Sequence, residues 1–371
     1  MAKRVLLGTT KGVFLLDPAK GYAVSGPLCD GWPINHVIGD PATGRLWAAG
    51  GGDWHGAGIW RSEDGGESWV LAKLANGKLD EWLTNDPAMA EQMGVQASPP
   101  APFTGKINNF WSLCYAHGVL YAGAKPAQLL RSLDGGVTWE TLHGLTDHPS
   151  AEGWEPGAAG LVLHSILTDP GDAQKLFVGI SAAGFFASED GGKSWERRVK
   201  RSNADAVRTG NEEIGYCVHN IQRAPDGTIW QQNHWGTYRS TDEGRTWNEV
   251  GQGLPSTFGF PIGAHPGDAS LAYVLPLNGD SMGRFPPDAQ CAVWRTQDGG
   301  ESWQAMRNGL PQTGCYFTVL RQAMATDASA PGSVYFGTNS GSVFASLDQG
   351  ESWSEIARHL PTVLAVEVLA G

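Results

Sequence analysis

Two histidines of this sequence occupy matched positions in successive apolar segments, each ending in a turn. His164 and His219 lie five residues before such a turn, and Asn35 and Gln322 hold the same position in two other segments. If the segments repeat radially, these side chains converge on one axis. Neutral imidazoles and amides that meet at one point can bind a transition metal or hydrogen-bond a polar ligand. The alternative for each residue is a purely structural role.

Two further histidines stand beside tryptophans in predicted loops, His55 after Trp54 and His234 before Trp235. Three imidazoles around one open coordination position make a catalytic metal geometry. We therefore predict a divalent metal ion whose candidate ligands are His164, His219, His234 and His55. Because the sequence has no HExxH pair, a histidine cluster that hydrogen-bonds a polar ligand is the alternative.

Carboxylates for acid–base chemistry come from the same predicted loops. Glu212 and Glu213, just upstream of Tyr216, Cys217 and His219, are the best candidates for a general base. The predicted catalytic residues are Glu212, Glu213, His219 and Asp53. Other carboxylates in these loops are Asp80, Glu81, Asp86, Asp280 and Asp288. Glycoside hydrolysis needs two carboxylates roughly 5 to 10 Å apart, so each single carboxylate can also be a solvated surface group.

Aromatic, amide and basic side chains of the same loops and strands are expected to bind the substrate. An exposed tryptophan can stack on the apolar face of a sugar ring, or it can anchor its own loop. The predicted substrate-binding residues are Asn35, His36, Trp54, Trp235, Arg284 and Gln322. Because His36 is one residue out of phase with Asn35, its side chain can instead point into the packing between neighbouring repeats.

The elements that position these residues are indicated by a repeated turn. The pattern [Ser/Thr]-x-Asp-x-Gly-x-[Ser/Thr]-Trp occurs six times, ending at Trp69, Trp139, Trp195, Trp247, Trp303 and Trp353. In each copy the aspartate can accept backbone N–H bonds across the turn, and a glycine permits positive φ. Each copy therefore predicts a pinned strand pair, with a tryptophan that packs into the core.

The tryptophans that end successive copies of the pattern are about 50 to 70 residues apart, which is enough for four short strands and their turns. This spacing predicts a β-propeller of seven blades, formed by residues 1–371 as a single domain with a loop insertion at about 73–106. The first blade would comprise about residues 1–27 and lacks one strand. The apolar segment 362–371 is expected to supply that strand and to close the ring, which removes both free sheet edges.

Boxes of this form resemble the bacterial neuraminidase repeat (BNR), or Asp-box, of sialidases, sortilin-type receptors, some xyloglucanases and photosystem assembly factors. The sequence is also similar to single-domain bacterial propellers labelled sialidase-like or glycosyl hydrolase, through Ile34-Asn35-His36-Val37, Asp147-His148-Pro149 and Gln232-Asn233-His234. The resemblance implies an Asp-box propeller, whose boxes lie far from the active centre. The Phe-Arg-Ile-Pro motif of sialidases is absent, so a conventional sialidase is not expected.

Composition excludes several other classes of protein. Of the 371 residues, 41% are hydrophobic and 17% charged, and no apolar run approaches the length of a membrane span. The net charge of −12 disfavours nucleic acid and anionic lipid as partners. Five widely spaced cysteines without a CxxC pair suit reduced thiols. Without an apparent signal peptide, we expect a cytoplasmic location.

Together these features predict a hydrolase or lyase that acts on a small polar or carbohydrate-like substrate. Its pocket would be rich in histidine and would lie on the loop-bearing face, over the central channel. The alternative is a non-catalytic propeller that binds a protein or a glycan through that face. The oligomeric state is left open.

Overall fold

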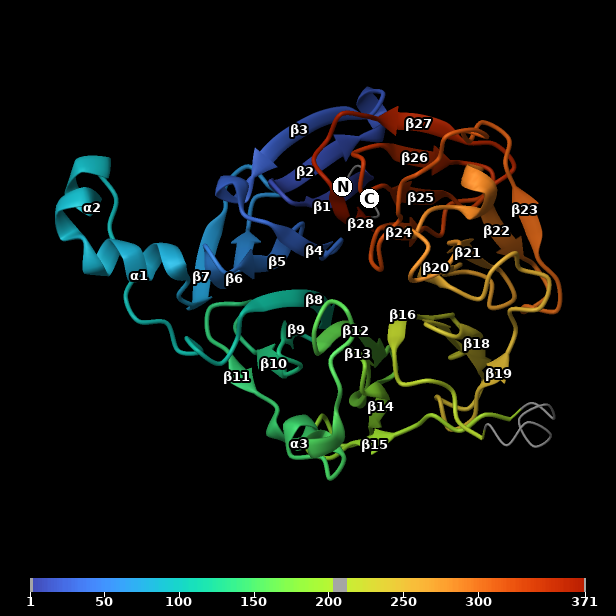
Figure 1. Cartoon of the computed structure of the whole chain (residues 1–371), viewed down its shortest axis with the longest axis horizontal. Coiled ribbons are helices and arrows are strands. Elements are labelled where there is room, and N and C mark those ends of the chain that lie inside the picture. The colour runs from blue at the N-terminus through green and yellow to red at the C-terminus, as the bar shows by residue number, and fades with distance from the viewer. Residues whose placement is uncertain (1–2, 203–211, 370–371) are drawn as a thin grey trace.

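The computed structural model describes residues 3–202 and 212–369, and these form seven four-stranded antiparallel sheets around a common axis (Figure 1). The predicted seven-bladed β-propeller is confirmed. Within each of the last six sheets the strands follow one another in sequence order, so each blade is a simple meander.

The blades contain the following strands. Blade 1 holds β28 (Val363–Leu369), β1 (Arg4–Thr9), β2 (Gly12–Asp17) and β3 (Ala23–Leu28). Blade 2 holds β4 (Ile34–Gly39), β5 (Leu46–Gly52), β6 (Gly56–Ser62) and β7 (Val70–Ala75). Blade 3 holds β8 (Asn109–Ala116), β9 (Val119–Lys125), β10 (Leu129–Ser132) and β11 (Glu140–Thr141). Blade 4 holds β12 (Val162–Asp169), β13 (Asp172–Ser181), β14 (Gly184–Ser188) and β15 (Glu196–Arg197).

The remaining blades continue the pattern. Blade 5 holds β16 (Val218–Arg223), β17 (Ile229–Asn233), β18 (Gly236–Ser240) and β19 (Asn248–Glu249). Blade 6 holds β20 (Gly259–Ala264), β21 (Ala272–Pro276), β22 (Val293–Thr296) and β23 (Gln304–Met306). Blade 7 holds β24 (Met324–Thr326), β25 (Val334–Gly337), β26 (Val343–Ser346) and β27 (Ser354–Ala357). Short 3-10 turns span Pro18–Lys20, Cys29–Gly31, Ala151–Gly153 and Pro287–Ala289.

The ring closes where the last strand joins the first. β28 pairs antiparallel with β1, with Val366 opposite Leu7 and Val368 opposite Val5. Val366 and Leu7 are fully buried in one apolar cluster that also includes residues of blades 6 and 7. The innermost strand of blade 1 is thus contributed from the far end of the sequence, as the sequence pattern predicts.

The turn of each box is held by its aspartate. In blade 2, Ser62 Oγ donates a hydrogen bond to Asp64 Oδ1 at 2.7 Å. The backbone N–H of Ser68 donates to the same oxygen at 2.9 Å. Gly66 donates its N–H to Ser62 Oγ at 2.7 Å with φ at +97°, and a Cβ there would lie 2.8 Å from Leu15. The turn therefore needs glycine both for its backbone conformation and for space.

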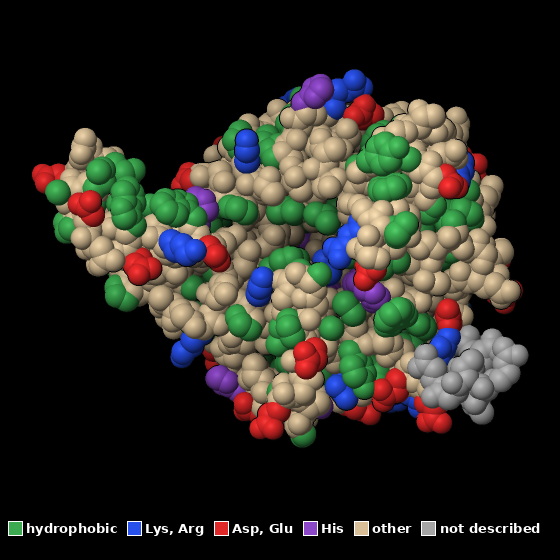
Figure 2. All heavy atoms as spheres, viewed as in Figure 1, with side chains coloured by type: hydrophobic (Ala, Val, Ile, Leu, Met, Phe, Trp, Pro, Cys, Tyr) green, Lys and Arg blue, Asp and Glu red, His purple; other side chains and the backbone are tan. Residues whose placement is uncertain are grey.

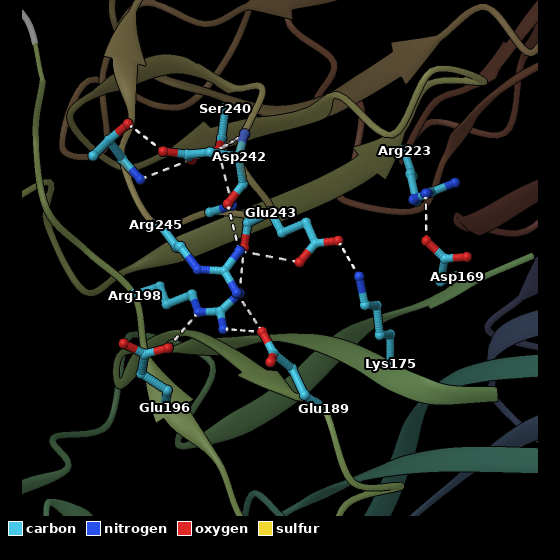
Figure 3. A network of polar contacts seen from close by, with 12 residues as sticks. Asp169, Lys175, Glu189, Glu196, Arg198, Arg223, Ser240, Asp242, Glu243 and Arg245 are labelled. Carbon is cyan, nitrogen blue, oxygen red and sulfur yellow. Dashed lines mark hydrogen bonds and ion pairs between the residues drawn. The ribbon is translucent and has the colours of Figure 1, made fainter. Parts of the chain in front are cut away.

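The last strand of one blade is tied to the next blade by polar side chains, clearest between blades 4 and 5 (Figure 3). Arg198, buried at the end of blade 4, donates to Glu243 O at 2.9 Å and pairs with Glu189 at 2.8 Å. Lys175 Nζ reaches Glu243 Oε1 at 2.6 Å, and Arg245 contacts both glutamates. These contacts join blade 4 to blade 5, which carries much of the candidate site.

The insertion expected as a loop at about 73–106 contains two short helices. They are α1 (Lys78–Asn85) and α2 (Pro87–Met93), which project away from the ring as an arm (Figure 1). A third helix, α3 (His143–Thr146), follows β11. No helix among the described residues is long and apolar enough to span a membrane.

Removing one box carboxylate is expected to destabilise the fold in a pH-dependent way. Asp242 accepts bonds from Ser240 and Thr246 at 2.7 to 2.9 Å. Burial favours its neutral form, but these hydrogen bonds lower its pKa overall. We expect Asp242→Ala to lower the free energy of unfolding by about 1 to 2 kcal/mol at pH 7.

The pH dependence follows from the sign of that pKa shift. A lowered pKa in the folded state stabilises the protein above the pKa of the unfolded chain, about 3.9, and this contribution is lost as the pH falls. Urea unfolding of both proteins at pH 7 and pH 3 should therefore show a smaller difference at pH 3. An equal difference at the two values would contradict a role for the carboxylate charge.

Candidate functional site

The innermost strands of blades 2 to 5 each contain a β-bulge, and in blades 2, 4 and 5 the bulged residue is one that alignment of the repeats singles out. The strand register skips Asn35, Trp111, His164 and His219. A bulge leaves its extra residue outside the ladder and re-aims its side chain. The matched polar positions are therefore a structural feature of the inner strands.

Three of these bulged side chains tie one blade to the next. Asn35 Nδ2 donates to Phe110 O at 2.8 Å, His164 Nε2 to Val218 O at 2.7 Å, and His219 Nδ1 contacts Gly259 O at 2.6 Å. In each pair the acceptor carbonyl precedes the bulge position of the next blade. Gln322 reaches across the channel, donating to Trp111 O and His164 O.

Several residues of the predicted site contact backbone groups or lie outside this arrangement. Asn35 and Gln322 use their amides on backbone carbonyls rather than facing a ligand. His164 Nε2 is hydrogen-bonded to Val218 O, and His164 Nδ1 is hydrogen-bonded to Ser165 Oγ. Both ring nitrogens therefore already have partners, and neither is left for a metal. His36 accepts a bond from Leu113 N and lies 3.2 Å from Glu367, in a separate cavity of about 270 Å³.

His219 differs from His164 in the ring nitrogen that it uses. Because Nδ1 contacts the Gly259 carbonyl, Nε2 is left as the free lone pair. Burial, reinforced by the charge of Arg321, lowers the pKa of His219 well below 6.5. Its imidazole is therefore neutral at pH 7 and can act as a base or a ligand.

A cavity of about 590 Å³ at the end of the channel brings His219 together with residues of five blades. We call it the channel-mouth pocket. Its lining includes Trp111, Cys217, His219, His234, Trp235, Phe258, Phe260, Asp280, Arg284, Thr318, Arg321 and Asn339. Figure 2 shows this face hollowed at the centre of the ring, with basic and histidine side chains beside the opening.

Three possible metal ligands meet on one wall of this pocket. The ligand atoms of Cys217, His219 and His234 all lie within 4.8 Å of one another. The two imidazole rings are 5.5 Å apart between centroids, in an edge-to-face arrangement. His234 Nε2 is also 3.5 Å from Asp280 Oδ2. This is the one such group of three among the described residues.

Two arginines give the pocket positive charge. The guanidinium groups of Arg321 and Arg284 lie 4.9 and 5.8 Å from the centroid of the Phe260 ring. Arg284 Nε donates to Asp280 O, whereas Arg321 Nε has no hydrogen-bond partner. Burial, together with the charge of Arg284, lowers the pKa of Arg321 to about 10, so it stays protonated at neutral pH.

Neither arginine forms an ion pair with a carboxylate of residues 3–202 or 212–369. Asp280 is the one carboxylate among the described residues that line the pocket. An acidic protein of net charge −12 thus keeps two unpaired guanidinium groups in one cavity. Such a site favours an anionic ligand.

The other predicted catalytic carboxylates lie elsewhere. Glu213 accepts a hydrogen bond from Tyr216 Oη at 2.6 Å beside a separate, smaller pocket, and Glu212 is exposed. Asp53 is largely exposed and lies 3.5 Å from Lys78 at the base of the helical arm. The sequence provided no distances among its loop carboxylates, so it could not single out Asp280.

The blade-2 loop is also separate from the channel-mouth pocket. His55 stacks on Trp32 at 5.1 Å, and Trp54 packs near Trp82 at 6.3 Å on the arm. Of the predicted residues, the pocket brings together His219, His234, Trp235 and Arg284. Cys217 and Arg321 were not among the predicted site residues, although Cys217 shares a strand face with His219 by two-residue alternation.

Comparison with known proteins finds sequence relatives among xyloglucanases. A xyloglucanase from Hypocrea jecorina is 24% identical over 235 residues, covering 63% of this chain and 25% of the relative. A Paenibacillus sp. xyloglucanase is 25% identical over 321 residues, covering 81% of this chain and 29% of the relative. The chain thus spans about a quarter of the length of these relatives.

The fold comparison points the same way. The GH74 xyloglucanase from Xanthomonas campestris superposes with a TM-score of 0.66 at 17% identity, covering 95% of this chain and 52% of the other. The chain is a seven-bladed propeller similar to xyloglucanases. No family model matches it. Membership of a BNR, sialidase-like family stays a prediction.

Proposed function

We propose that the protein is a hydrolase or lyase that acts on a small, carbohydrate-like substrate carrying an anionic group. The observation that supports this most directly is the position of Arg321, unpaired, in the same cavity as the imidazoles of His219 and His234. The arginine would hold the anion, and the histidine wall would face the bond that reacts.

The walls of the channel-mouth pocket suit such a molecule. Trp235, which is 65% exposed, and Trp111 offer flat apolar surfaces against which a sugar ring can pack. Asn339 and Thr318 add polar groups on the side of blade 7. Apolar walls with a few convergent polar groups are typical of small-molecule sites.

The acid–base groups of the pocket favour metal-assisted hydrolysis or elimination over the two-carboxylate mechanism. Hydrolysis by the two-carboxylate mechanism needs a pair of carboxyl groups flanking the bond, and the described lining supplies Asp280 alone. Metal-assisted hydrolysis, or elimination next to a carboxylate held by arginine, needs no such pair. The predicted divalent metal therefore belongs to this proposal.

An expected result tests the anion preference. Calorimetric titration should show D-galacturonate or D-glucuronate binding at least about tenfold more tightly than galactose or glucose, a difference of about 1.4 kcal/mol. Arg321→Gln should abolish this preference. The matched control is Arg45→Gln, which removes a charge from the exposed ion pair with Glu63, and it should bind as the unmodified protein does.

Turnover is followed by mass spectrometry of products released from uronate-containing oligosaccharides and from xyloglucan oligosaccharides. Cleavage confined to the neutral xyloglucan fragments would contradict the proposed substrate class. Binding of a glycan without turnover would favour the non-catalytic propeller instead.

A further inference from the structure

We infer that Cys217, His219 and His234 form a site for one zinc-class metal ion with an open coordination position facing the channel-mouth pocket. The inference deepens the proposed function and rests on it for a catalytic role, whereas ion binding stands on the geometry alone. One thiolate and two imidazoles suit Zn²⁺ or Co²⁺ and do not suit Mg²⁺ or Ca²⁺, which prefer oxygen.

The three ligand atoms are already close enough to converge on an ion. They lie within 4.8 Å of one another, and an ion bound about 2.0 to 2.3 Å from each requires only small side-chain movements. Three protein ligands leave a fourth, tetrahedral position free. Free fourth positions of this kind are where water or substrate binds in catalytic zinc sites.

Each ligand also has an outer contact that orients it. The Gly259 carbonyl contacts His219 Nδ1 at 2.6 Å, which leaves Nε2 for the ion. Asp280 Oδ2 lies 3.5 Å from His234 Nε2, which leaves Nδ1. Ser181 Oγ lies 3.4 Å from Cys217 Sγ. A carbonyl or carboxylate behind a ligating histidine is the usual second layer of a metal site.

The backbone that carries the ligands is part of blade 5. Cys217 immediately precedes β16, His219 is in that strand, and His234 occupies the tight turn between β17 and β18. His234 N donates to Cys217 O at 3.0 Å, so the turn and the strand entry are hydrogen-bonded to each other. The three residues are therefore positioned by blade 5 itself.

The pocket that holds this group also contains positive charge. Arg321 and Arg284 line the same cavity as the three ligands. A substrate whose anion is held by these guanidinium groups would place its reacting group near the open position. The thiolate of Cys217 and the carboxylate of Asp280 offset the charge of a divalent ion.

The experiment uses the full chain, stripped with a chelator and then titrated with Co²⁺. We expect one cobalt per chain, with a thiolate-to-cobalt charge-transfer band and the visible bands of a tetrahedral ion. Cys217→Ser should remove the charge-transfer band, and His234→Gln should weaken binding. Asp280→Asn, which changes only the outer contact, should weaken cobalt binding by about tenfold.

Cys114→Ser is the matched control, because Cys114 is a partly buried thiol outside this group, and it should keep the full spectrum. Thermal melting of each apo variant checks that it folds. Absence of cobalt binding, or a spectrum unchanged in Cys217→Ser, would overturn the inference. Stoichiometric cobalt without turnover of any sugar acid would instead overturn the proposed function and leave the metal site standing.

Discussion

Replacing His219 by asparagine is expected to abolish turnover while leaving the propeller folded. An asparagine amide can occupy the place of Nδ1 and keep the contact with Gly259 O, as Asn35 does with Phe110 O in blade 2. The substitution removes Nε2, the nitrogen that the Gly259 contact leaves free. We expect kcat/KM for the preferred sugar acid to fall by about a hundredfold or more.

The matched control is His164→Gln. His164 occupies the equivalent bulge in blade 4 but uses Nε2 on Val218 O, and a glutamine amide can reach the same carbonyl. This variant should keep both turnover and cobalt binding. If the two variants lost activity equally, the inner-strand histidines would act only as links between blades, and the distinction drawn between them would be wrong.

Placing a charge in the closing strand is expected to have the largest effect on stability. Val366 of β28 is fully buried, opposite Leu7, and its N–H bonds Gln322 O at 2.8 Å. Val366→Asp would bury a carboxylate in an apolar cluster, at a cost of about 4 kcal/mol. Urea unfolding monitored by tryptophan fluorescence should show a correspondingly lower midpoint.

Val24→Asp provides the comparison for this change. Val24 lies on β3, the outer strand of the same blade, and is 47% exposed. The same chemical change there should alter the free energy of unfolding by less than about 0.5 kcal/mol. Similar destabilisation at both positions would mean that ring closure by β28 contributes little to holding the propeller together.

The fold was accessible from the sequence because its main determinants are local. Each box contains both the aspartate that accepts the hydrogen bonds and the glycine that the turn requires, within a few residues of each other. The closing strand could be inferred because the first blade lacks one strand and the last apolar segment lacks a blade. The helices of the arm could not be inferred, since their contacts come from residues such as Asp80 and Lys73 that meet only after folding.

The site was predicted only in part, for three physical reasons. Alignment places His164 and His219 at the same radius, but it does not show which ring nitrogen meets the next blade. Cys217 follows the same alternation as His219, yet a thiol near a strand is most often an apolar core group. Asp280 and Arg321 lie in loops of the two blades that follow blade 5, and the sequence does not show that these loops meet over one cavity.

The most direct test of this account is anomalous diffraction at the zinc edge from a crystal of the full chain grown with zinc chloride and D-galacturonate. We predict one strong peak about 2.0 to 2.3 Å from Cys217 Sγ, His219 Nε2 and His234 Nδ1, with the sugar carboxylate on Arg321. A channel-mouth pocket that holds neither ion nor sugar acid, or a zinc peak at another site, would contradict it.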